Sequence, residues 1–299
     1  MQAILAPVNQ QLDQLTNINL QDMLDNFGLG QLRRGRQLIE QVFRPPARKF
    51  ARLVIEFDRR VGEVGLPSAA EELLLRYAQH LDVAGAGHVP AGGPVVFASN
   101  HPGMVDTLAC FTGIARTDLR AVAADRPFTH SLPNIDRHLI YVPNEPAERL
   151  AAVRQVTRHL HSGGAVLICP AGRIEPDPAC MPGAVDALVD WSDSLGLFVR
   201  RAPETTIVPV VVSGVIQAST LRSPLIRFRR NQKDRERVAA TLQLLQHTLR
   251  PAARPLNVRI EFGPALPGRE LIALGSAAAA TKAITASVRQ IVQRLKVEG

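Results

Sequence analysis

The stretch VVFASNHPGMVD, residues 95–106, joins a short apolar run to a polar turn and then to a helical run. Residues 95–99 predict a buried strand, and Pro102 and Gly103 are residues typical of a turn. A helix is expected to begin near Asp106. Sites in α/β sheets are usually built beyond the C-terminal ends of strands. The stretch therefore predicts a strand–loop–helix unit with a candidate site in its loop.

The chain after residue 94 repeats this alternation. Further β-rich runs lie at residues 120–124, 139–142, 165–169, 206–212 and 257–262. Helical patterns lie at residues 146–161, 183–195, 234–249 and 276–296. Such alternation predicts an α/β fold in which helices cover a sheet.

Residues 1–82 have a different pattern, and we predict that they form an N-terminal helical region. Phe50, Val54, Phe57 and Val61 follow one another at spacings of four, three and four, which predicts a helix over 46–61 with one apolar stripe. Another helix is predicted to begin near Ser68. The boundary with the α/β domain, residues 83–299, is expected in the loop 84–93.

The composition is that of a folded globular protein, with 46% apolar and 21% charged residues among 299. The cysteines are odd in number and show no CxxC spacing, which argues against a disulfide framework or a zinc cage. We therefore expect a reducing compartment and no metal. The beginning of the chain lacks the pattern of a secretory signal, and no apolar run is long enough to cross a membrane.

The net charge of +8 favours anionic partners, and two basic regions carry much of it. Residues 33–60, from Arg33 to Arg60, hold nine Arg and Lys against three acidic residues, and residues 222–237 hold seven against two. Leu225 and Phe228 lie within the second region. Such a mixture suits an anionic membrane surface or an acidic carrier protein, and the alternative is a solvated face. Sparse aromatic residues argue against nucleic acid.

His101 and Asp106 are the candidate catalytic pair. An Asp five residues after a His, at the start of the next helix, is placed to face the imidazole and fix its tautomer. A neutral imidazole held in this way accepts a proton from a hydroxyl or amine that attacks a carbonyl. The alternative is that Asp106 caps the helix and His101 packs in the loop.

Asn100, His101 and Asp106, in the pattern Asn-His-x4-Asp, resemble the signature of the glycerolipid acyltransferases, which include lysophosphatidate and glycerol-3-phosphate acyltransferases. The resemblance covers about residues 83–265. It implies an α/β fold with a mixed, largely parallel sheet covered by helices, preceded by an N-terminal helical extension. It also implies that His101 acts as the base with Asp106 as its partner, and that Asn100 and Gly103 lie at the substrate.

The resemblance implies transfer of a fatty acyl chain from an acyl-CoA or acyl-carrier-protein thioester to a hydroxyl or amine of a glycerolipid-like acceptor, such as a lysophospholipid. No cofactor is implied beyond the acyl donor. We expect a cytoplasmic protein that is peripheral on the inner face of the cell membrane. Two alternatives remain: a thioester hydrolase that uses the same pair with water, and a non-catalytic protein that binds a membrane or nucleic acid.

A second block of the family resembles ICPAGRIE, residues 168–175. Pro170 and Gly172 match the family's Pro-Glu-Gly-Thr-Arg turn, whereas Ala171 stands where the family usually has Glu. Arg173 follows the glycine directly, and the resemblance implies that this block meets the acceptor's phosphate. The alternative for Arg173 is a surface ion pair. We expect Arg126 to be a further contact for the acceptor's phosphate. The run IVPV, residues 207–210, resembles a third block of the family, for which a structural role is expected.

Overall fold

A computed structural model describes residues 2–32, 34–250 and 255–298. The N-terminal part contains α1 (Gln2–Asn26), α2 (Arg36–Val64), α3 (Leu66–Leu74), β1 (Ala78–Ala84) and η1 (Ala86–His88). The central part contains β2 (Val95–Ser99), α4 (Met104–Ile114), β3 (Arg120–Ala124), α5 (Pro127–His130), α6 (Pro133–Asp136), β4 (Leu139–Val142), η2 (Pro146–Glu148), α7 (Arg149–His161), β5 (Ala165–Ile168), η3 (Asp186–Asp190) and α8 (Ser194–Arg201). The last part contains β6 (Thr206–Ser213), α9 (Ala218–Leu221), α10 (Pro224–Arg227), α11 (Gln232–Leu249), β7 (Leu256–Phe262), β8 (Leu266–Pro267), α12 (Gly268–Ala273) and α13 (Ala277–Glu298).

The strands form one mixed, largely parallel sheet in the order β1-β7-β6-β2-β5-β3-β4, and β8 pairs with β6. β2 lies between β5 and β6 and is parallel to both. β7 runs antiparallel to β6, and β1 runs parallel to β7. The predicted α/β fold is therefore confirmed, and the strand predictions agree with the structure to within one residue at each end.

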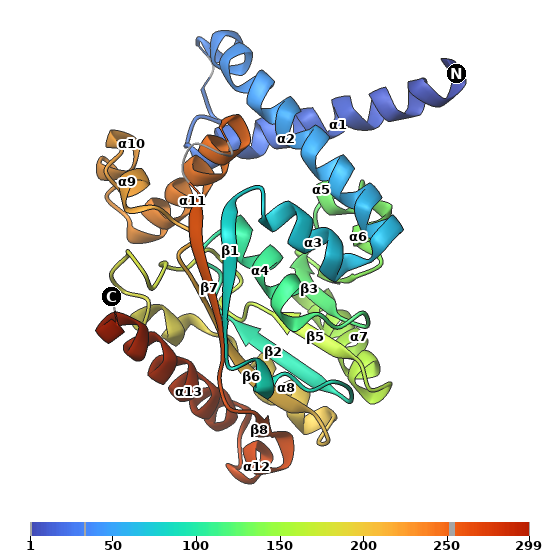
Figure 1. The fold of residues 1–299 in the computed structure, drawn as a ribbon, viewed down its shortest axis with the longest axis vertical. Helices are drawn as coiled ribbons and strands as arrows, with labels where there is room; N and C mark the ends of the chain where they lie inside the picture. The colour runs from blue at the N-terminus through green and yellow to red at the C-terminus, as the bar shows by residue number, and fades with distance from the viewer. Residues whose placement is uncertain (1, 33, 251–254, 299) are drawn as a thin grey trace.

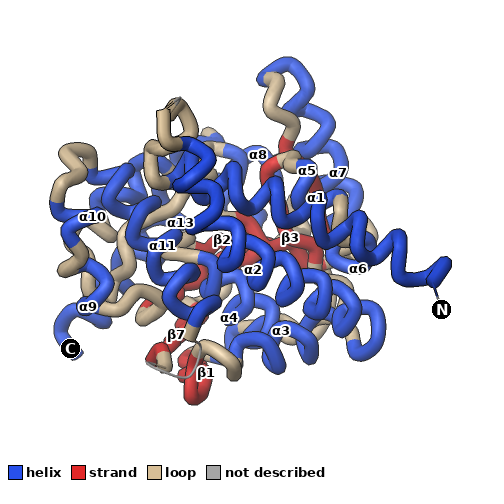
Figure 2. The backbone as a smooth tube through the Cα atoms, turned by 90° about the horizontal axis from the view of Figure 1, so that it is seen from above, coloured by secondary structure: helices blue, strands red, loops and turns tan. Residues whose placement is uncertain are grey.

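Helices cover both faces of the sheet (Figures 1 and 2). The side chains of β2 alternate between the faces, as the period of a strand requires. Val95 and Phe97 join the core on the side of α3 and α4, whereas Val96 and Ala98 join the core on the side of α7, α8 and α13. β2 is buried on both faces, and a continuous apolar run is the sequence pattern of such a strand.

The N-terminal helices pack against the rest of the chain, although the start of α1 projects away from it (Figure 1). Asp58 of α2 is buried and accepts hydrogen bonds from the backbone N–H groups of Asn134 (2.9 Å) and Ile135 (2.8 Å). These bonds satisfy donors in the first turn of α6, which would otherwise lack partners. The Asp58 carboxylate thus fastens α2 to the α/β part of the molecule.

One local prediction was wrong, and two predicted helices are present with different bounds. Residues 78–82, assigned to the helical region, belong to β1, which pairs with β7 from the other end of the chain. The helix predicted over 46–61 begins ten residues earlier and continues through its two prolines, packed along α1. The helix predicted to begin near Ser68 is α3, which begins two residues earlier, at Leu66, with a proline in its first turn.

The helix predicted over 183–195 is also wrong. A short 3-10 helix, η3, ends at Asp190, Trp191 is extended, and α8 begins only at Ser194. The Trp191 indole N–H donates to Glu175 at 2.8 Å, a contact between segments that no local pattern contains. Within the described residues, no helix is both long and apolar enough to cross a membrane.

Candidate active site

The loop after β2 lies where the carboxyl ends of three parallel strands, β5, β2 and β6, meet. Asn100 fixes its start, because the side chain donates to the Val212 carbonyl (2.9 Å) and accepts from the Val212 N–H (2.8 Å). The amide is buried and both of its ends are engaged with β6. Asn100 therefore orients the loop, and its predicted contact with substrate stays a prediction.

His101 and Asp106 are brought together as the spacing predicted. His101 Nδ1 lies 2.9 Å from Asp106 Oδ2, and a quarter of the imidazole remains exposed while Asp106 is buried. The carboxylate accepts from Nδ1–H, so the lone pair of the neutral ring is on Nε2. No described residue bonds to Nε2, which leaves this nitrogen available as a proton acceptor.

Asp106 also fulfils the alternative role of a helix cap. Its Oδ2 accepts from the Gly103 N–H at 2.9 Å, and its Oδ1 accepts from the Thr107 hydroxyl at 3.0 Å. The Gly103 N–H is therefore directed at Asp106 and not at an open space. The two readings of Asp106 do not compete, because the same carboxylate starts α4 and holds the imidazole.

The electrostatic environment of His101 favours its protonated form. Burial by itself lowers the pKa of His101, but the charge and hydrogen bond of Asp106, with a further contribution from the Glu175 carboxylate, outweigh it. The net result is a pKa above the ordinary value. A proton taken up by His101 during a reaction is thus stabilised by two carboxylates.

The loop after β5 lies beside the loop after β2, and the Glu175 N–H donates to the His101 carbonyl at 2.8 Å. Pro170 is buried, whereas Gly172 is exposed and adopts a left-handed conformation, with φ +62°. Glycine suits this position because a side chain would be strained there. Pro170 and Gly172 thus build the turn that leads to Arg173.

Arg173 is held by two carboxylates and a carbonyl. Its Nη2 donates to Asp190 at 2.6 Å and its Nη1 donates to Glu236 at 3.0 Å and to the Ile174 carbonyl at 2.8 Å. Glu236 is buried, whereas Asp190 is exposed and also pairs with Lys233. In this structure Arg173 thus forms the ion pair that the sequence left open as its alternative role.

Arg126 lies apart from these residues. It is exposed and precedes α5, beyond the end of β3, two strands away from β2. Its charge acts on Asp22 of α1, where it opposes the effect of burial on the pKa of that carboxyl. The structure places Arg126 at the same edge of the sheet as His101, without a described contact between the two.

The sequence reading missed two buried carboxyls that follow Arg173. Glu175 bonds to both His101 and Trp191, and Asp177 accepts from the N–H groups of Gly214 and Ile216, at the end of β6. The available signal was the single Trp of the chain, because a buried indole N–H needs an acceptor. The local pattern could not say which carboxylate supplies it.

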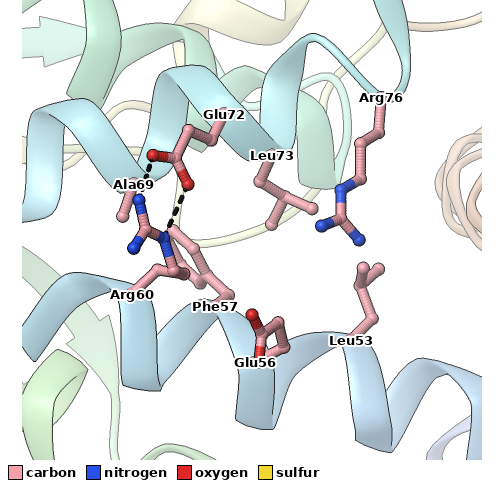
Figure 3. A pocket seen from close by; sticks show the side chains of 8 residues that line it. All are labelled: Leu53, Glu56, Phe57, Arg60, Ala69, Glu72, Leu73 and Arg76. Atoms are coloured by element: carbon pink, nitrogen blue, oxygen red, sulfur yellow. Dashed lines mark hydrogen bonds and ion pairs between the residues drawn. The ribbon is translucent and has the colours of Figure 1, made fainter. Parts of the chain in front are cut away.

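A small pocket lies elsewhere, between α2 and α3 (Figure 3). Its volume of about 20 Å³ suffices for roughly one water molecule. Arg60 and Glu72 pair across it, beside Phe57 and Leu73. It is lined by residues of α2 and α3 and by Arg76, so it is not part of the site around His101.

Comparisons with known proteins found a solved structure and a family model that match this chain. The chain is similar to the crystal structure of the 1-acyl-sn-glycerophosphate (LPA) acyltransferase, PlsC, from Thermotoga maritima, with 14% sequence identity and a TM-score of 0.48. The match covers 99% of this chain and 98% of that one. No curated protein matches the sequence. The model of the family described as Acyltransferase matches residues 80–213, which include both loops. The resemblance to acyltransferases is thereby confirmed: residues 80–213 of this chain match the Acyltransferase family.

Proposed function

We propose that this protein transfers a fatty acyl chain from an acyl-CoA or acyl-carrier-protein thioester to a hydroxyl or amine of a glycerolipid-like acceptor, with His101 as general base. The observation that carries the proposal is the bond between His101 Nδ1 and buried Asp106, which leaves Nε2 open on a ring that is a quarter exposed. The family match over the same residues supports it.

The chemistry requires one base and no covalent enzyme intermediate. Nε2 of His101 takes the proton of the acceptor hydroxyl as its oxygen attacks the thioester carbonyl. The new C–O bond forms, the C–S bond breaks, and the thiolate leaves and takes the proton back. Asp106 stabilises the imidazolium between these steps. Cys110 is buried and Cys169 is half-buried, and burial raises the pKa values of both thiols, so neither is suited to act as the nucleophile.

We propose that an acceptor phosphate, where the acceptor has one, is met by Arg173. Nε and Nη2 of Arg173 both face Asp190, which is exposed, whereas Nη1 faces buried Glu236. A phosphate that displaced Asp190 would find a guanidinium fork already oriented by Glu236. Arg126 is proposed as a second, more distant phosphate contact.

We propose that the protein works at the cytoplasmic surface of an anionic membrane, with residues 222–230 in contact with it. Phe228 and Leu225 are exposed there, next to Arg222, Arg227 and Arg230. These three arginines have no carboxylate partner among the described residues. In the first basic region Arg36, Arg48, Arg59 and Arg60 pair with acidic side chains. Arg44 and Arg52 of that region have no carboxylate partner among the described residues, and Arg33 lies outside them. The exposed Phe228 and Leu225 therefore distinguish residues 222–230 more than the pairing of the arginines does.

The test is thiol release from palmitoyl-CoA by the purified protein, with and without lysophosphatidate, glycerol-3-phosphate or a lyso-aminolipid. Acceptor-dependent release and an acylated product are the expected results. Acceptor-independent release with free fatty acid would identify a thioester hydrolase instead. No release from palmitoyl-CoA or from a palmitoylated carrier protein would overturn the proposal and favour a non-catalytic binding protein.

A further inference from the structure

Glu175, on the loop after β5, is bonded to the backbone of His101 in both directions. Its Oε2 accepts from the His101 N–H at 3.0 Å, and its own N–H donates to the His101 carbonyl at 2.8 Å. The side chain is only 2% exposed. The two bonds fix the peptide units on both sides of the His101 Cα. They therefore fix the position of the backbone from which the imidazole side chain extends.

The second oxygen of Glu175 has an equally fixed partner. Oε1 accepts from the indole N–H of Trp191, which is itself buried, at 2.8 Å. Both oxygens therefore face N–H donors, one from the backbone and one from a rigid ring. An ionised carboxylate fits this arrangement, because it offers acceptors only.

The charged and titratable groups around Glu175 are few. His101 and Arg173 act on it electrostatically, and its own charge acts on His101 and Cys169, as the charge of Asp106 also does. Burial raises the pKa of Glu175 to about 7, although the bonds from Trp191 and His101 oppose the rise. The hydrogen bonds from Trp191 and His101 thus favour the ionised form of Glu175.

We propose that Glu175 is a positioning residue for His101, which it holds through the backbone and whose imidazolium it stabilises as a second carboxylate beside Asp106. The role of the imidazole as base rests on the proposed function. The contacts of Glu175 with His101 and its effect on the pKa of the imidazole do not depend on the proposed function. They can therefore be measured in the absence of substrate. Trp191 is the residue that keeps Glu175 oriented and charged.

The primary test is the pKa of the His101 imidazole, followed by NMR in histidine-labelled protein, with His101→Ala to assign the signal. In Glu175→Gln the pKa of His101 is expected to fall by roughly half a unit to one unit, because one of two neighbouring carboxylates is gone. Trp191→Phe is expected to lower it less, since a Glu175 that has lost a donor is more often protonated at neutral pH.

Asp177→Asn is the matched control. Asp177 is a buried carboxyl on the same loop that accepts backbone N–H bonds, but its partners are Ala179, Gly214 and Ile216. This variant is expected to lose stability and to leave the pKa of His101 unchanged. An unchanged pKa of His101 in Glu175→Gln, or an equal shift in Asp177→Asn, would overturn the inference.

The double variant separates positioning from charge. The glutamine of Glu175→Gln sets an NH2 group against one of two N–H donors, and adding Trp191→Phe removes that conflict. If the proposed acyl transfer is observed, Glu175→Gln is expected to lower kcat/KM about tenfold, and the double variant is expected to recover part of that loss with the lowered pKa of His101 retained. If Glu175→Gln alone does not fold, the pKa of His101 can be measured in the double variant instead. Full recovery of both quantities would reduce Glu175 to a packing role.

Discussion

The loops that follow β2 and β5 lie side by side and use their charged residues in opposite ways. His101 binds Asp106 through one ring nitrogen and keeps the other without a partner among the described residues. Arg173 directs its N–H groups at Asp190, Glu236 and a carbonyl. Both loops lie within residues 80–213, which match the Acyltransferase family, yet of the two residues only His101 presents a reactive nitrogen without a described partner. The difference shows that a sequence motif identifies the residues of a candidate site, whereas their hydrogen bonds determine which atoms are available to a substrate.

The largest expected effect comes from removing the uncommitted nitrogen. His101→Ala is expected to lower kcat by roughly 10²- to 10⁴-fold, the usual contribution of a general base. Acceptor-dependent thiol release measures it, with circular dichroism to establish that the fold is retained. His130→Ala is the matched control, because His130 bonds to Asp125 and Asp136 outside the site. Equal losses in the two variants would refute the assignment.

Asp106→Asn is expected to lower kcat about 100-fold, since an amide cannot both fix the tautomer and stabilise the imidazolium. The variant also weakens the start of α4, where Asp106 accepts the Gly103 N–H, at a cost of about 1 kcal/mol of stability. Steady-state kinetics and urea unfolding separate the two effects. A stable, fully active variant would leave Asp106 with the capping role alone.

The pH dependence tests the state of the base. His101 must be neutral to accept a proton, and its pKa is raised by Asp106 and Glu175 against the effect of burial. We therefore expect kcat/KM to rise with pH about tenfold per unit below this pKa and to level off above it. In Asp106→Asn the inflection should move to lower pH. An inflection that stays in place would mean that another group controls the profile.

Arg173→Gln sharpens the comparison from the other loop. Buried Glu236 loses its cation, so we expect a loss of about 1–3 kcal/mol in the free energy of unfolding, measured with urea. If Arg173 also meets the acceptor phosphate, KM rises about tenfold for lysophosphatidate and not for a phosphate-free acceptor. A loss of stability with equal KM changes for the two acceptors would limit Arg173 to its internal ion pairs.

The smallest expected effect compares an arginine without a carboxylate partner among the described residues, Arg227, with a paired arginine, Arg59. Arg227→Gln is expected to weaken binding to phosphatidylglycerol vesicles by ~1 kcal/mol, about fivefold, in a sedimentation assay. Arg59→Gln is the control, since Arg59 already pairs with Glu56 and Glu63. Equal effects of the two substitutions would contradict the assignment of the membrane surface to residues 222–230.

The sequence by itself predicted six strands of the sheet, β2 to β7, and the pairing of His101 with Asp106. Buried parallel strands are continuous apolar runs, and the His–Asp spacing places both residues around one strand-to-helix turn, so these features depend on neighbours within a few residues. For this reason residues 95–106 predicted both a strand and a pair whose atoms lie 2.9 Å apart.

Only the tertiary structure decided what depends on distant partners. β1 is a strand because β7 lies beside it, and the predicted helix over 183–195 is interrupted where Trp191 bonds to Glu175. The ion pairs of Arg173 and the clamp of Glu175 on His101 likewise join segments separated by 17 to 74 residues. Local patterns carry no information about such contacts, because burial and pairing are set by which segments the fold brings together.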